Sequence, residues 1–204
     1  MKKLLLTTLF LGLFISTSNA KSSEDGPRVF HYAGIGYQHN NIDYKTDHQG
    51  DSSGCTLNCK NGFERDYSNA HFLVGHKLTS NIAMEVGYFR KRDENKNDVS
   101  TGIRSKTNLR VINLDTVFSL PITSGSNHKL IGIVSLLDIK HSSQSSLVSS
   151  IDDNGYGYGI GAGVRLGITD SVAVEIYSKI SEVEKIHYID DIVTYGINIK
   201  AGVF

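Results

Sequence analysis

GYGYGIGAGVRLGI, residues 155–168, is the stretch that decides the fold. Four of its glycines recur at every second position: Gly157, Gly159, Gly161 and Gly163. A phosphate-binding loop of the GxGxxG kind needs an uneven glycine spacing and a helix that starts directly after it. Here the spacing is strictly two, which predicts one face of a β-strand. We expect this glycine face to leave room for longer side chains opposite it.

The same period of two recurs along the whole chain. It predicts eight strands, at about residues 29–39, 69–78, 82–91, 107–120, 129–140, 156–168, 172–182 and 192–203. Short connections alternate with long ones, and the long ones are expected at 40–68, 92–106, 141–155 and 183–191. In an up-and-down sheet this alternation gathers the short turns at one end, as in outer-membrane barrels.

Five of the predicted strands, at 82–91, 107–120, 156–168, 172–182 and 192–203, have an aliphatic face and a face of small or polar residues with isolated charges. The charges on the second face are Glu85, Asp115, Arg165, Glu175 and Lys200. Inside a small barrel they would pair into a network, because an unpaired buried charge is costly. We therefore predict an all-β fold, an eight-stranded antiparallel up-and-down transmembrane β-barrel. The alternative is a secreted, soluble, lipocalin-like barrel with a ligand in an apolar lumen.

The first twenty residues, MKKLLLTTLFLGLFISTSNA, predict a secretory signal peptide cleaved after Ala20. Residues 21–204 would then form one barrel domain. Lys and Arg (21) balance Asp and Glu (21), and no basic block indicates nucleic-acid binding. In an exported protein, the close pair Cys55 and Cys59 predicts a disulfide that stiffens one loop.

Three segments carry a family resemblance: HFLVGHKLTSNIAMEVGYFRKR, VFSLPIT and GAGVRLGITDSVAVEIYS. In order and spacing they resemble the OmpA-type eight-stranded transmembrane domains of the small outer-membrane β-barrel family, over residues 28–204. The resemblance implies lumenal positions for Glu85, Arg165 and Glu175. The last residue, Phe204, resembles the C-terminal insertion signal read by the barrel-assembly machinery, although it is in phase with Lys200 rather than with the aliphatic set.

These features predict a non-enzymatic surface protein of the bacterial outer membrane, with no cofactor or bound metal. The expected partners are outer-membrane lipid and lipopolysaccharide, the barrel-assembly machinery, and host surface molecules reached through four long loops. A lipid-modifying barrel enzyme is the further alternative, for which His141-Ser142-Ser143 is the nearest catalytic candidate. His71 is expected to have a structural role in the lumen. We also expect Gly163→Ala to be milder than Val164→Arg, which would place a charge in lipid.

Overall fold

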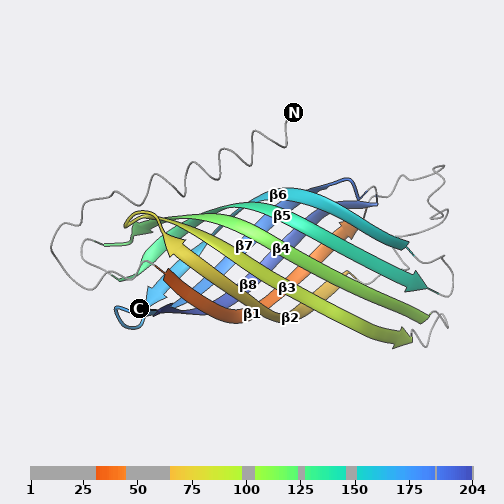
Figure 1. Cartoon of the computed structure of the whole chain (residues 1–204), viewed down its shortest axis with the longest axis horizontal. Helices are drawn as coiled ribbons and strands as arrows, with labels where there is room; N and C mark the ends of the chain where they lie inside the picture. Colours follow the sequence, from red (N-terminus) through yellow and green to blue (C-terminus); the bar gives the residue numbers. More distant parts are fainter. Residues whose placement is uncertain are drawn as a thin grey trace.

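The computed structural model describes residues 31–44, 65–97, 104–123, 127–145, 151–186 and 188–203, and they form a closed antiparallel barrel (Figure 1). The strands follow one another around it in chain order: β1 (His31–Tyr44), β2 (Asp66–Lys77), β3 (Ile82–Asn97), β4 (Arg104–Pro121), β5 (Lys129–Ser145), β6 (Ile151–Gly167), β7 (Val172–Glu184) and β8 (Ile189–Val203). β1 pairs with both β2 and β8, which closes the sheet. The predicted eight-stranded up-and-down barrel is confirmed.

The two ends of the barrel differ in their connections. β1 begins and β8 ends at the same end as the connections 78–81, 122–128 and 168–171, and we call this the turn end. The opposite end, where the strands in Figure 1 reach beyond the barrel body, is called the loop end. In outer-membrane barrels the short turns are periplasmic.

The strands run further toward the loop end than the sequence predicts. β3 continues to Asn97 and β4 begins at Arg104, so 92–106 is mostly paired strand rather than a long connection. The same correction applies to 141–155, where β5 reaches Ser145 and β6 begins at Ile151, and to 183–191. The physical reason is that backbone pairing above the membrane needs no aliphatic face. Polar sequences such as RKRDENKN therefore form strands that show no hydrophobic alternation.

Large aliphatic and aromatic side chains cover the outside of the barrel. The exposed ones on the strands are Ile35, Tyr37, Phe72, Val74, Val86, Tyr88, Ile112, Phe118, Leu120, Leu130, Val134, Leu136, Tyr156, Tyr158, Ile160, Ile176, Ile180, Tyr195, Ile197 and Ile199. A soluble barrel would turn polar residues outward, and a continuous apolar girdle of this kind suits hydrocarbon. The barrel is therefore a membrane-spanning one, and the lipocalin-like alternative is excluded. Among the described residues, no helix is long and apolar enough to span a membrane.

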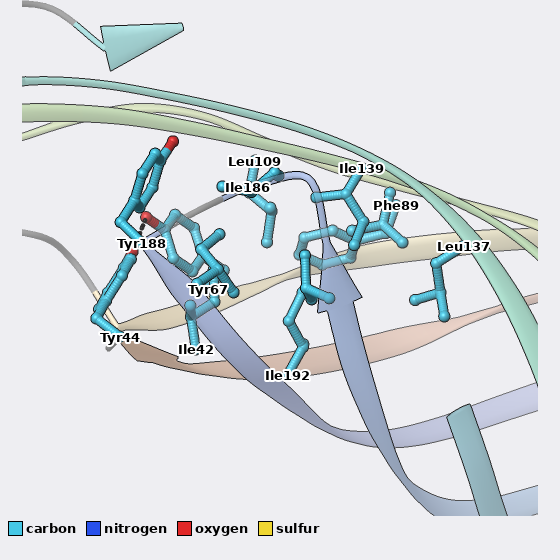
Figure 2. Packing of buried hydrophobic residues seen from close by; sticks show 13 residues of the cluster. Ile42, Tyr44, Tyr67, Phe89, Leu109, Leu137, Ile139, Ile186, Tyr188 and Ile192 are labelled. Atoms are coloured by element: carbon cyan, nitrogen blue, oxygen red, sulfur yellow. Dashed lines mark hydrogen bonds between the residues drawn. The ribbon is translucent and has the colours of Figure 1, made fainter. Parts of the chain in front are cut away.

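The lumen is filled by side chains in two zones. Toward the loop end it holds an apolar plug, which we define by its members: Ile42, Tyr44, Tyr67, Phe89, Leu109, Val111, Leu137, Ile139, Val183, Ile186, Tyr188, Ile189 and Ile192. Figure 2 shows these side chains converging from several strands into one cluster. Toward the turn end the lumen holds charged and polar side chains together with two smaller apolar clusters. An interior filled in this way is typical of an eight-stranded barrel.

The glycine face of β6 has a different function from the predicted one. A Cβ added to Gly157 or Gly163 would clash with backbone carbonyl oxygens of the neighbouring strand β7, those of Glu182 and Ile176. At Gly161 it would meet both the Ser178 carbonyl and the Lys179 side chain. The glycines thus allow β7 to approach β6 closely, rather than only leaving space for distant side chains. That Gly163→Ala costs less than Val164→Arg stays a prediction, and the Ile176 carbonyl and Tyr177 backbone beside Gly163 raise the expected cost of the alanine.

Candidate functional site

Four charged side chains meet inside the turn-end half of the barrel. Glu85 comes from β3, Arg165 from β6, Glu175 from β7 and Lys200 from β8. Lys200 Nζ lies 2.5 Å from Glu85 Oε1 and is also paired with Glu175. Arg165 is paired with Glu175, and its Nη2 lies 3.9 Å from Glu85 Oε1. We call these four residues the charge network.

The charge network is electrically balanced and mostly buried, and Arg165 is its most exposed member, with 13% of its side chain exposed. Its two acids are 2–5% exposed, and Lys200 is 4% exposed. The Tyr32 hydroxyl adds a hydrogen bond of 2.5 Å to Glu85 Oε1. Removal of one member from such an arrangement leaves an uncompensated buried charge, which is costly. The network therefore joins β3 to the consecutive strands β6, β7 and β8.

Asp115 lies outside the charge network and has its own partner. Lys179 Nζ on β7 lies 3.0 Å from Asp115 Oδ2, and both side chains are buried. Ser135 and Asn113 donate further hydrogen bonds to Asp115, of 2.5 and 2.7 Å. Lys179 was missed by the sequence analysis, although it has the same phase as Glu175 and so shares its lumenal face.

A histidine lies among the tyrosines of the apolar plug. His141 Nε2 is 3.1 Å from the Tyr67 hydroxyl and 3.3 Å from that of Tyr44, and its Nδ1 is 3.0 Å from the Tyr188 hydroxyl. Tyr188 lies outside the strands, and burial raises the pKa of its hydroxyl above the usual value. Ser142, the next residue in the catalytic candidate, is on the opposite face of β5.

His71 lies in the lumen between the charge network and the plug. It is 3% exposed, and its Nδ1 is 3.3 Å from Asn198 Oδ1. Over the described residues, no group of three or more His, Cys, Asp or Glu side chains is arranged to hold a metal ion. Cys55, Cys59 and Phe204 lie outside the described residues, as does the predicted signal peptide, so these remain predictions.

One cavity of about 200 Å³ opens at the turn end. Its walls include Tyr32, Arg165 and Lys200, so the charge network forms its inner boundary. Lys77 and Lys129 also line it. The cavity thus ends at the ion pairs, and beyond them Asp115–Lys179 and the apolar plug occupy the lumen.

Comparisons with known proteins address the fold. No protein-family model and no curated protein matches the chain. Neisserial surface protein A is similar, with a TM-score of 0.60 and 12% identity over 85% of this chain and 97% of that one. So is the attachment invasion locus protein Ail of Yersinia pestis, with a TM-score of 0.55 and 11% identity over 85% and 99%. The N-terminal β-barrel domain of OprF from Pseudomonas aeruginosa is also similar, with a TM-score of 0.52 and 12% identity over 83% of this chain and 96% of that domain.

The chain therefore has the fold of the small eight-stranded outer-membrane β-barrels. In this chain itself, the closed barrel and its exposed apolar girdle are the observations that support a membrane location. At 11–12% identity the likeness extends to the fold and not to the neighbours' activities.

Proposed function

We propose that the chain is a non-enzymatic surface protein of the bacterial outer membrane, whose barrel is a closed scaffold that presents the loop end outside the cell. The filled lumen is the observation that carries this proposal. The charge network, the Asp115–Lys179 pair and the apolar plug follow one another along the barrel. A barrel blocked at three levels is suited to anchoring a surface rather than to general diffusion.

The proposed partners follow from the surfaces that the barrel offers. Outer-membrane lipid and lipopolysaccharide surround the apolar girdle, and the barrel-assembly machinery acts during biogenesis after export of the signal-bearing chain. Host surface molecules would meet the loop end, through the connection 45–65 and the extended hairpins β3–β4 and β5–β6. Exposed polar side chains such as Asp152 on β6 support contact with water above the girdle.

Epitope insertion tests this topology in intact cells. One tag is placed in 45–65 at the loop end, and the matched control tag in 122–128 at the turn end. The proposal expects antibody to label the loop-end tag on intact cells and the turn-end tag only after the outer membrane is permeabilised. Labelling of the turn-end tag on intact cells would contradict the proposal.

Lipid analysis tests the non-enzymatic part of the proposal. Mass spectra of lipid A and phospholipids from cells with and without the protein should be the same. A new acylation, deacylation or cleavage product that depends on the protein would replace the proposal with a lipid-modifying enzyme.

A further inference from the structure

Three cations stand side by side on the outer face of β3, β4 and β5. Arg90 is the register partner of Arg110, and Arg110 is the partner of Lys140. Arg90 has the same phase as Tyr88, and Arg110 the same phase as Ile112, both of which are exposed on the apolar girdle. The three side chains, which we call the basic row, therefore leave the barrel on its lipid side, at the loop-end edge of the girdle.

The charges of the basic row are only partly compensated. Like charges directly opposite one another on paired strands are destabilising. Arg110 Nη2 lies 3.4 Å from Asp138 and Lys140 Nζ 3.2 Å from Asp152, which are loose pairs between exposed side chains. Among the described residues Arg90 has no ion-pair partner. The Nε atoms of Arg90 and Arg110 are buried without a hydrogen-bond partner in the described part of the chain.

The opposite sector of the same rim has the opposite charge. Glu182 and Glu184 on β7 are exposed, and Glu182 is the register partner of Asp191 on β8. An anionic group at this depth is therefore repelled from β7–β8 and attracted to β3–β5. Two neighbouring guanidinium groups match the oxygens of a phosphate, which accepts several N–H bonds at once.

We propose that the basic row binds a phosphate group of a lipid in the outer leaflet, the phosphorylated glycolipid lipid A. The position of the row selects a lipid over a free anion, because the acyl chains of the same molecule would lie on the girdle below Tyr88 and Ile112. This inference rests on the outer-membrane location and on the loop-end-outward topology proposed above.

The test measures binding of bisphosphorylated lipid A to the barrel refolded in detergent micelles, by native mass spectrometry. Arg90→Gln/Arg110→Gln is expected to weaken lipid A binding about tenfold or more, because charge-assisted hydrogen bonds are lost. Lys185→Gln removes a loop-end cation away from the row and should bind like the unaltered protein. Dephosphorylated lipid A should bind more weakly to the unaltered protein, and equimolar inorganic phosphate should not displace the lipid.

Three results would overturn the inference: equal binding by the double variant, equal binding of dephosphorylated lipid A, or full displacement by inorganic phosphate. The last result would indicate a general anion site. If the Gln variant does not refold, Arg90→Lys/Arg110→Lys keeps the charge but loses the planar fork, and it should still bind lipid A several-fold more weakly. Heat-modified mobility on a gel of the outer-membrane fraction tests the proposed outer-membrane barrel independently of lipid A. A barrel that is found in this fraction but binds lipid A no better than dephosphorylated lipid A contradicts the lipid A inference alone.

Discussion

Asp115 and Lys179 form a buried ion pair that is separate from the charge network. Removing the charge of one partner is expected to destabilise the barrel more than removing the charges of both. Lys179→Met leaves the Asp115 carboxylate buried with hydrogen-bond donors but without a cation, so the free energy of unfolding should fall by about 3–5 kcal/mol. Asp115→Asn/Lys179→Met removes both charges and should lose clearly less. Urea titration of the refolded barrel in micelles measures both variants, and a double variant at least as unstable as the single one would contradict this account.

Two glycines provide a matched test of the close approach between β6 and β7. A Cβ at Gly163 would overlap the Ile176 carbonyl oxygen and the Tyr177 backbone, whereas a Cβ at Gly132 on β5 would meet nothing within 4 Å. Gly163→Ala should therefore destabilise by about 1–3 kcal/mol. Gly132→Ala should be neutral or stabilise by up to about 1 kcal/mol, since it restricts the unfolded chain. Equal unfolding midpoints for the two variants would be inconsistent with the observed packing.

Strand phase is tested along a single element, β6. Val164 faces outward and is the register partner of Leu130 and Ile176 on the girdle. Val164→Arg should cost about 2–4 kcal/mol, because the charge enters hydrocarbon. Asn154 has the same outward phase on the same strand but lies near the loop end opposite Lys140, so Asn154→Arg should cost about 0–1 kcal/mol for its depth and about 0.2–1 kcal/mol for the like charge opposite it. Unfolding in lipid bilayers measures both, and similar costs at both depths would contradict the placement of the membrane.

The sequence predicted the membrane-spanning part of each strand because lipid imposes a strict period of two there. It failed beyond the membrane, where Glu94 pairs with Thr107 and Lys106 with Gln144 without an aliphatic face to mark the strand. The candidate site was likewise predicted only in part. Four predicted charges meet in the network, whereas Lys179 and the plug around His141 depend on which strands face each other across the barrel. The phase of β7 already marks Lys179 as lumenal, but its pairing with Asp115 across the barrel and the membership of the plug are tertiary information.

On the scale of the whole molecule, the lumen has barriers in series, and this leads to a conductance prediction. The charge network closes the turn-end cavity, and the apolar plug separately fills the loop-end half. The protein reconstituted in planar bilayers should therefore show no steady conductance. Lys200→Met should stay closed as well, because removal of one cation opens the first barrier and leaves the plug in place.

A variant of the plug distinguishes barriers in series from a single gate. Phe89→Ala/Ile139→Ala removes two fully buried side chains from the plug and leaves the charge network unchanged, so this variant should also remain closed. Steady conductance should appear only when all three levels are opened, in Lys200→Met/Lys179→Met combined with Phe89→Ala/Ile139→Ala, provided that its heat-modified mobility shows a folded barrel. Steady conductance of Lys200→Met alone would show that the ion pairs are the sole seal, and the plug would then be permeable to water and ions.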